Sequence, residues 1–444
     1  MTPKLFVMFA RYAMIAVVSL VCVVHAQEPA TPQTGSVGES SSKPDLFKPA
    51  DGSEESQTSP GFGQEIRQIG GASILSAQPG FLRVGPFYVS SIEGVGSHIN
   101  FRDAGRDNRS SGLIRSHMFF DKSFQHSRIT LQYQPKIAFY PEGVHADFLN
   151  QRIGFASEFA LTQRFKLTVI DNFSFIDDRE QALEAGLSAD PRTNYLSQNH
   201  LLGREGRYVV NDLRLSAGYL LGARTQIKID PTIGYGYSSH TAAGERGMRL
   251  GGTVSLHRQL RPTTTVGVYY GFHRNAFQRQ FSDSNYHNMG LTYATNLTPN
   301  WSVQLTAGGV NMDDGLGRHW TAEGGIQTIR KFRSSSLSLA YSRNSAFYTN
   351  LKPGFADHGD IMYSRSFGQR LAASLGIGAY REAWSLRDSE YRYVSSNVSY
   401  RLIPSVNWFA TYTYRKQKGS SSELLLGAHD TFVTGFQWSP GGRR

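Results

Sequence analysis

The sequence predicts an all-β protein, an antiparallel transmembrane β-barrel of about 18 strands, with about 16 strands as the second choice. Three observations predict this fold class. Apolar and polar residues alternate with a period of two, short polar turns recur at nearly constant intervals, and no segment approaches the roughly 18 consecutive apolar residues of a spanning helix. The alternation is typical of strands with one apolar face, and the missing apolar run excludes helical membrane spans.

The composition also favours strands. The chain has 444 residues, a mean hydropathy of -0.36 and 39% hydrophobic residues, so two or three soluble domains would each have a thin core. Aromatic residues and glycine are frequent, with 22 Tyr, 27 Phe and 45 Gly. This mixture suits many amphipathic strands better than it suits helices.

Residues 1–26 are interpreted as a secretory signal peptide. Lys4 and Arg11 precede the apolar stretch AMIAVVSLVCVV, and the tripeptide VHA ends at the expected cleavage site after Ala26. The apolar stretch has 12 residues, too few for a bilayer span of about 20. Cleavage would remove Cys22, the only cysteine, and with it any thiol nucleophile or thiolate metal ligand. A retained membrane anchor and a lipoprotein acylated at Cys22 are the alternatives.

Residues 27–80 are predicted to form a disordered periplasmic leader. Up to about Ser59 the segment is rich in Ser, Pro, Thr, Glu and Gly, and it has too few apolar residues to offset the entropy of ordering. Residues 60–80, PGFGQEIRQIGGASILSAQPG, include a short apolar piece that could act as a plug segment. The whole region is too short for a folded plug domain, which disfavours the 22-strand transporters that carry one.

The predicted barrel occupies residues 81–438 and is followed by a tail at 439–444. Short turns are predicted at Lys122–His126, Leu161–Arg164, Leu221–Arg224, Leu260–Thr263, Leu297–Asn300, Lys331–Ser334, Phe367–Arg370 and Leu402–Ser405. From the third turn onward they begin 39, 37, 34, 36 and 35 residues apart, which is the length of one hairpin plus one longer loop. Nine such hairpins give about 18 strands. The pattern is weakest near Arg83–Ile99, where the loss of a strand would leave about 16.

The two faces of each strand can be assigned by parity. In TQIKIDPTIGYGY the isoleucines of one parity oppose Lys228 and Asp230 of the other. A soluble sandwich would bury these charges, whereas a membrane barrel would place them in a wet lumen and leave no buried charge. Pro231 would interrupt a ladder and is expected to mark a bulge.

Aromatic residues gather near the predicted strand ends, as interfacial girdles require. The residues assigned to the girdle are Trp301, Trp408, Tyr412, Tyr414, Phe436 and Trp438. A sandwich core is the alternative explanation of these aromatics. It would need more bulky residues on the inward faces than the sequence provides.

The signal peptide, the leader, about 350 residues of alternating strands and the aromatic-ended final strand HDTFVTGFQW together resemble a bacterial outer-membrane β-barrel porin. The last strand is similar to the signal recognised by the barrel-assembly machinery, although SPGGRR follows Trp438. The segment FLRVGPFYV, Phe81–Val89, resembles β-barrel porins linked to exopolysaccharide export. The resemblance implies a Gram-negative outer membrane, contact with its lipid and lipopolysaccharide, short periplasmic turns and longer extracellular loops.

Charge suggests what the lumen favours. The net charge of the chain is +11, and removal of Lys4 and Arg11 leaves 11 - 2 = +9. Basic residues on the polar parity are predicted to line the lumen: Lys136, Arg152, Lys166, Arg214, Lys228, Arg249, Arg401 and Arg415. Acidic residues of the same parity could create, with these cations, an electric field across the lumen: Glu158, Asp212, Asp230 and Glu323. Lumen cations favour anions. The alternative is that these charges only fill and cross-link the interior.

No motif predicts catalysis. Histidines are scattered without metal-ligand spacing, no GxSxG occurs, and acid–histidine neighbours fall in or beside predicted outer loops. We therefore expect no enzyme activity, no catalytic residue, no metal and no cofactor. Nucleic-acid binding is not expected either, because the arginines are spread over alternate strand positions rather than gathered in a patch.

The sequence thus predicts a passive outer-membrane channel with a basic lumen that passes anionic or polar solutes, with anionic polysaccharide as the specific version. The alternative is a closed structural or adhesive barrel that acts through its extracellular loops. The long loop at 176–207 could serve as a lid, a binding element or a constriction. The oligomeric state stays open.

Overall fold

The structure is a computed structural model. It describes residues 83–84, 87–101, 109–139, 150–177, 207–238, 245–277, 283–313, 317–346, 354–383, 388–419 and 427–439. The predicted signal peptide, leader and plug segment lie outside these residues, as does the predicted tail after Ser439. Within the described part of the chain, no helix is long and apolar enough to cross a membrane.

Eighteen long strands follow a two-residue strand, β1 at Arg83–Val84. They are β2 (Phe87–Phe101), β3 (Arg109–Ser123), β4 (Ser127–Phe139), β5 (Asn150–Ala160), β6 (Phe165–Asp177), β7 (Arg207–Gly222), β8 (Thr225–Ser238), β9 (Glu245–Arg261), β10 (Thr264–Phe277), β11 (Ser284–Thr298), β12 (Trp301–Asp313), β13 (Arg318–Lys331), β14 (Ser335–Ala346), β15 (Gly354–Phe367), β16 (Leu371–Ala383), β17 (Asp388–Ile403), β18 (Val406–Gly419) and β19 (Gly427–Trp438).

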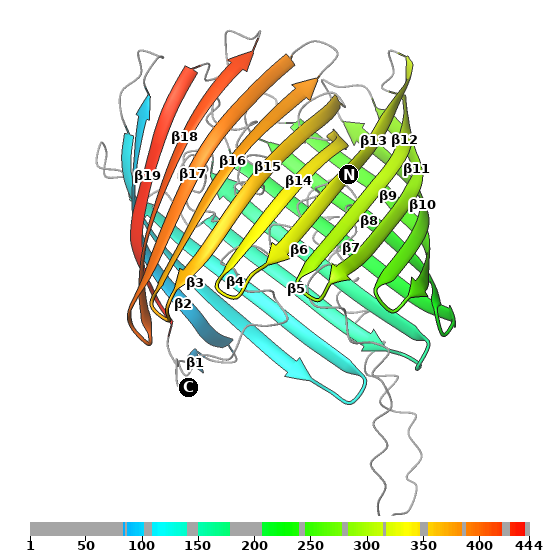
Figure 1. The fold of residues 1–444 in the computed structure, drawn as a ribbon, viewed down its shortest axis with the longest axis horizontal. Helices are drawn as coiled ribbons and strands as arrows, with labels where there is room; N and C mark the ends of the chain where they lie inside the picture. Colours follow the sequence, from blue (N-terminus) through cyan, green and yellow to red (C-terminus); the bar gives the residue numbers. More distant parts are fainter. Residues whose placement is uncertain are drawn as a thin grey trace, which may run out of the picture. The chain divides into compact units, whose positions relative to one another are not determined.

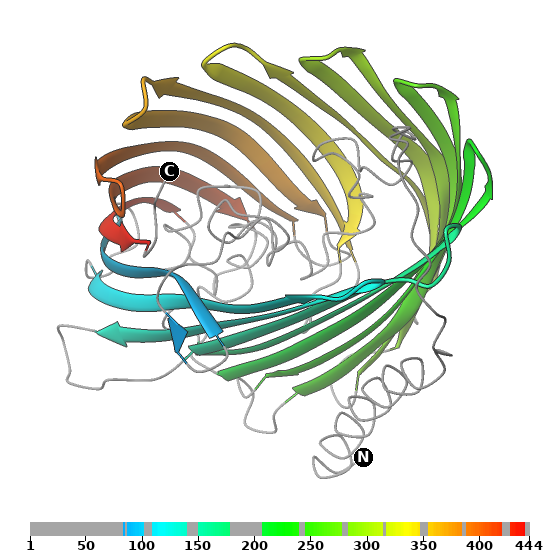
Figure 2. The same ribbon diagram turned by 90° about the horizontal axis from the view of Figure 1, so that it is seen from below.

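These strands form a closed antiparallel barrel. Each strand from β2 to β18 pairs with the next one in the chain, and β19 returns to pair with β2 over ten positions that include Thr431 opposite Ile99. Figures 1 and 2 show this closure from the side and from below. The predicted 18-strand barrel is confirmed. The second choice of 16 strands is wrong, because β2 forms in the stretch where the alternation is weakest.

All eight predicted short turns lie between consecutive strands, from the β3–β4 turn to the β17–β18 turn. Backbone hydrogen bonds tie these turns to neighbouring strands, for example from Arg401 N to Arg370 O at 2.7 Å. Gly368, in the β15–β16 turn, has a φ of 68°. At the other end of the barrel, the described ends of consecutive strands lie further apart in the sequence. Strands β6 and β7 extend to Asp177 and Arg207, so the predicted loop begins and ends in strand, and residues 178–206 lie outside the described part.

Pro231 does not mark a bulge, contrary to expectation. The register of β7 against β8 is the same on both sides of it, from Arg214 opposite Thr232 to Ala217 opposite Ile229. Only the intervening pairs are missing, because proline has no N–H to donate to the ladder. The pairing with β9 continues without a shift. A proline in a barrel strand can therefore cost a local break in one ladder without changing the register.

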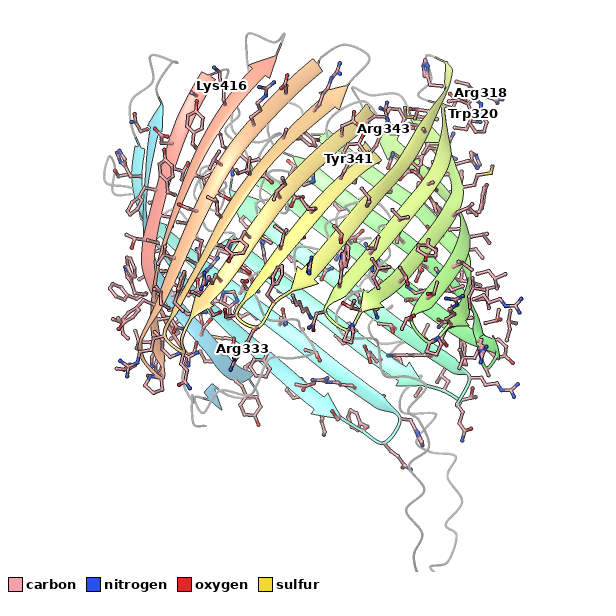
Figure 3. The ribbon with its side chains drawn as sticks, viewed as in Figure 1. Arg318, Trp320, Arg333, Tyr341, Arg343 and Lys416 are labelled. Carbon is pink, nitrogen blue, oxygen red and sulfur yellow. The ribbon has the colours of Figure 1, made fainter. Side chains whose placement is uncertain are left out.

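The two faces of the barrel wall differ as the alternation predicts. Large apolar side chains are exposed on the outward parity, such as Leu291 at 62%, and Figure 3 shows side chains pointing away from the wall around the barrel. The inward parity is mainly Ser, Thr, Asn, Gln, Gly and charged residues. A small apolar cluster of Tyr286, Val310 and Met312 packs on the inside. Polar residues thus dominate the lumen side.

Candidate functional site on the lumen wall

Cations gather on one side of the lumen wall. We call the inward-facing cations of β3 to β9 whose side chains the structure describes the basic arc: Arg115, Arg128, Lys136, Arg152, Lys166, Arg214, Lys228 and Arg249. They share the wall with five carboxylates, Glu93 of β2 and Asp121, Glu158, Asp212 and Asp230, so these side chains carry 8 - 5 = +3. The inward positions described on β10 to β12 carry no permanent cation.

The first cluster of the arc lies on β2, β3 and β4. Arg115 is opposite Glu93 on one side and Lys136 on the other, and its guanidinium donates to the Glu93 carboxylate. Gln437 of β19 donates to the other Glu93 oxygen at 3.1 Å, across the seam that closes the barrel. His117 Nε2 lies 3.7 Å from the same oxygen. The closing seam is therefore anchored by a charged network.

The second cluster spans β7 to β9. Asp212, Gly234 and Arg249 form one row across these strands, and Arg249 Nη2 donates to Asp212 Oδ1 over 2.8 Å. Glycine in the middle of the row leaves room for this contact. Arg214 Nη2 lies 4.0 Å from the other Asp212 oxygen. Asp212 thus neutralises part of the charge of two arginines.

The arc contains three further ion pairs. Two of them lie near the short turns, and the third lies on β8. Arg128 donates to Asp121 at 2.8 Å, and Lys166 Nζ is 3.1 Å from Glu158. On β8, Lys228 Nζ is 3.4 Å from Asp230. Three of the acids predicted to set up a transverse field therefore sit among the cations and pair with them.

Glu323 lies apart from the arc. It accepts hydrogen bonds from Tyr269 at 2.7 Å and from Asn288 at 3.0 Å. Tyr269 reaches it across Gly290 and Gly308, which lie between them in one row over β10 to β13. The carboxylate is held against the wall by strands that carry no cation of the arc.

Two predicted basic residues also lie outside the arc. Arg415 is an inward residue of β18, and Arg401 is an exposed residue beside the β17–β18 turn. The arc itself includes two residues that sequence reasoning missed. Arg128 shares strand and parity with Lys136, so the same rule could have found it. Arg115 was obscured because Leu113 and Phe119 share its parity.

Not all of the wall charges are solvated, which differs from the expectation for a wet lumen. Lys136 is 1% exposed and Asp212 is 2% exposed. The ion pair with Arg249 offsets the cost of burying the Asp212 carboxylate. The side chains of Lys166, Lys228 and Arg214 are more open, at 43%, 32% and 27%. Arg128 is also 32% exposed, but two hydrogen bonds fix its guanidinium to both oxygens of Asp121. Lys166, Lys228 and Arg214 are therefore the open cations that a passing solute could contact.

The six predicted girdle residues all have the outward parity. They are Trp301, Trp408, Tyr412, Tyr414, Phe436 and Trp438. Three of their polar tips bond to neighbouring strands. Trp301 donates to Thr328 at 2.8 Å, Trp408 donates to Thr434 at 3.0 Å, and Tyr412 donates to Asp430 at 2.6 Å. Within the described residues, no group of three or more His, Cys, Asp or Glu could hold a metal ion.

No protein-family model matches the sequence, and no curated protein matches it. Among solved structures, OccK2 (OpdF) of Pseudomonas aeruginosa is similar with a TM-score of 0.46 and 10% identity, over 79% of this chain and 97% of that protein. OpdK of the same organism, crystallised with vanillate, has a TM-score of 0.45 and 9% identity, over 79% and 97%.

The ferric citrate transporter FecA is similar with a TM-score of 0.43 and 10% identity, over 78% of this chain and 63% of that protein. The chain therefore spans less than two thirds of the length of FecA. These similarities are distant, and the function of the chain has to follow from its own residues.

Proposed function

We propose that the protein is a passive outer-membrane channel whose lumen favours anionic solutes. The membrane placement is supported by the outward face, where Leu291, Met289 and Phe436 each leave more than half of their surface exposed, at 62%, 53% and 55%. Hydrocarbon would cover such surface at a gain of about 25 cal/mol per Å². A closed barrel also leaves no unpaired strand edge in the bilayer.

The single observation that carries the proposed selectivity is the one-sided basic arc. With its paired carboxylates it carries +3 toward the lumen, and a low-dielectric wall behind it would strengthen its attraction for anions. Carboxylates and phosphates pair well with arginine and lysine. The polar serines, threonines and amides of the other strands would solvate the neutral part of a solute.

The version with anionic polysaccharide is supported by the spacing of the open cations. Lys166 and Lys228 lie on either side of Gly218 in one row across β6, β7 and β8. Arg214 lies four residues along β7, about 13 Å away at about 3.3 Å per residue. Spaced cations along the wall could pair with successive carboxylates of an extended chain.

The experiment is single-channel recording of refolded residues 27–444 in a planar bilayer, with soluble polyuronate added to one side and neutral dextran of matched size as the control. We expect a steady conductance that polyuronate reduces at concentrations where dextran has no effect. Equal block by both polymers would remove the charge-based version. A silent bilayer, with insertion verified by protease protection, would contradict the channel itself.

A closed structural or adhesive barrel is the second candidate, and the buried, cross-linked charges around Glu93 and Asp212 favour it. The two candidates differ in their response to replacing residues 178–206 with a short Gly-Ser linker. A channel in which this segment narrows the lumen would conduct more. An adhesive barrel would show no change in conductance and would lose binding of whole cells to a surface.

A further inference from the structure

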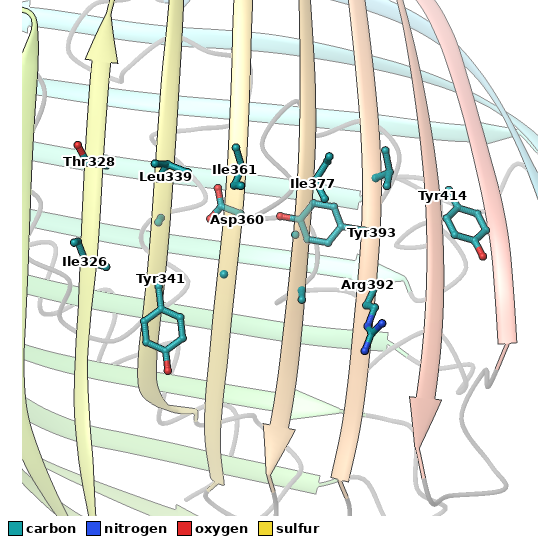
Figure 4. Close-up of a pocket in the computed structure, with 15 residues that line it drawn as sticks. Ile326, Thr328, Leu339, Tyr341, Asp360, Ile361, Ile377, Arg392, Tyr393 and Tyr414 are labelled. Carbon is teal, nitrogen blue, oxygen red and sulfur yellow. The ribbon is translucent and has the colours of Figure 1, made fainter.

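We propose that a groove on the outward face of β13 to β18 binds a phosphate-bearing glycolipid of the outer leaflet, with an acyl chain in the groove and the phosphate at its cationic end. This inference rests on the proposed membrane placement and does not depend on channel activity. The groove has a volume of about 780 Å³, which is within the size range of ligand sites. Figure 4 shows the side chains that line it.

The floor and the walls of the groove follow from one row of paired residues. Tyr341, Gly359, Ala379, Arg392 and Lys416 lie side by side on β14 to β18. Glycine and alanine in the middle leave the sheet bare, while Tyr341 stands on one side and Arg392 on the other. A narrow apolar chain can therefore lie along the strands between two larger side chains.

The next row toward the short turns is apolar. Leu339, Ile361, Ile377 and Val394 occupy corresponding positions on β14 to β17. Ile361 and Ile377 are about half exposed, at 49% and 51%. This row would continue the groove toward the middle of the bilayer, where an acyl chain gains most from apolar contact.

The next row toward the long loops is charged. Arg343, Asp357, Arg381 and Glu390 occupy successive positions on β14 to β17, two or three residues from the strand ends. Figure 3 places Tyr341, Arg343 and Lys416 toward the same end of the barrel. That end would face the headgroups of the outer leaflet, because long loops of outer-membrane barrels are extracellular.

The charges at this end favour an anion. Four cations, Arg343, Arg381, Arg392 and Lys416, stand against Asp357 and Glu390, which gives 4 - 2 = +2. Arg392 bonds Glu390 at 2.6 Å in a pair that is 70% and 39% exposed, and Arg343 lies 3.6 Å from Asp357. Exposed pairs of this kind are weak. A phosphate can therefore compete for the arginines, which would hold it with paired N–H donors.

The test is native mass spectrometry of refolded residues 27–444 titrated in detergent with diphosphoryl lipid A and, separately, with its phosphate-free form. Wild type should retain one diphosphoryl lipid. The double substitution R392Q/K416Q should weaken its binding at least about tenfold, because a lost charge-assisted bond accounts for about that factor. It should not change binding of the phosphate-free lipid. R258Q/R330Q removes the same charge from outward positions near the short turns and should bind like wild type.

Filling the groove is the second arm. A Cβ at Gly359 would meet nothing nearer than Tyr341 at 3.9 Å, so Gly359→Leu should fold and should lose the bound lipid of either form. Ala217→Leu, an outward substitution on β7, should keep it. Equal lipid retention by all variants would overturn the proposal. So would loss of a dimer or trimer in Gly359→Leu, because the groove would then be a contact between copies. Neither result would affect the conductance test.

Discussion

Asp212 illustrates how single residues keep charge on the lumen wall. Its carboxylate is 2% exposed and contacts Arg249 directly, with Arg214 at the edge of ion-pair range. Burial alone would make this carboxylate costly, and the paired guanidiniums offset that cost. The residue is therefore important through its partners, since its removal would leave both arginines without this carboxylate.

We predict that Asp212→Asn lowers the free energy of unfolding by about 2 kcal/mol, because a charge-assisted bond is lost and partly buried guanidinium charge stays behind. Urea unfolding of the refolded barrel in vesicles would measure it. Asp283→Asn is the matched control. The N···O distance from Asp283 to Arg274 is 3.1 Å, close to the 2.8 Å between Asp212 and Arg249. The side chains of Asp283 and Arg274 are 45% and 55% exposed, so we expect almost no change in stability. Equal losses in both variants would contradict a special role for Asp212.

The parity of most site residues could be predicted from the sequence at this scale, but their partners could not. Lys228 and Asp230 alternate with isoleucines, and this pattern is local. The contact between Asp212 and Arg249 depends on the registers of two ladders and on a glycine between them. Alternation shows which face a residue lies on but not which residues are opposite each other on neighbouring strands. Glu158, Asp212 and Asp230 were therefore expected to create a field across the lumen, although each pairs with a cation beside it.

At the level of elements, the short turns define where each hairpin begins and ends. The turn residues are polar and local, so all eight turns were predictable from sequence alone. The prolines were harder to interpret. Pro135 resembles Pro231, since the β3–β4 register is unchanged on either side of a missing stretch beside it. A bulge cannot be predicted from proline alone.

Gly368 gives a prediction for one turn. With a φ of 68°, it has a conformation that costs an L side chain about 1 kcal/mol or more. We expect Gly368→Ala to lower the free energy of unfolding by about that amount. Gly222, at the end of β7, has an ordinary φ, and a Cβ added there would meet no atom within 4 Å, so Gly222→Ala should be neutral. Loss of stability in both, or in neither, by vesicle unfolding would refute this explanation.

The groove on β13 to β18 was beyond sequence prediction for a related reason. Tyr341, Gly359, Ala379 and Arg392 are neighbours only after three registers are known. In the sequence each looks like an ordinary outward position. The charged row above them consists of residues that alternate with lumen positions, so its clustering emerges only in the closed sheet.

For the barrel as a whole, closure and charge asymmetry are the two features with functional consequences. The seam joins β2 to β19, more than 300 residues apart in sequence, and Gln437 bonds Glu93 across it. The strand count sets a lumen wide enough for inward side chains and water. The basic arc gives this lumen one basic side, because the strands that carry its cations, β3 to β9, are neighbours in the barrel.

The most direct test of the proposed channel is its reversal potential in a salt gradient, compared between wild type and K166Q/R214Q/K228Q. These substitutions neutralise the three open cations of the arc. Wild type should be anion-selective, and the variant should shift toward zero or to cation selectivity. The control R224Q/R333Q/R370Q changes the same charge in three exposed short-turn residues and should keep the wild-type sign. Cation selectivity in wild type, or equal shifts in both variants, would contradict an anion-favouring lumen set by the basic arc.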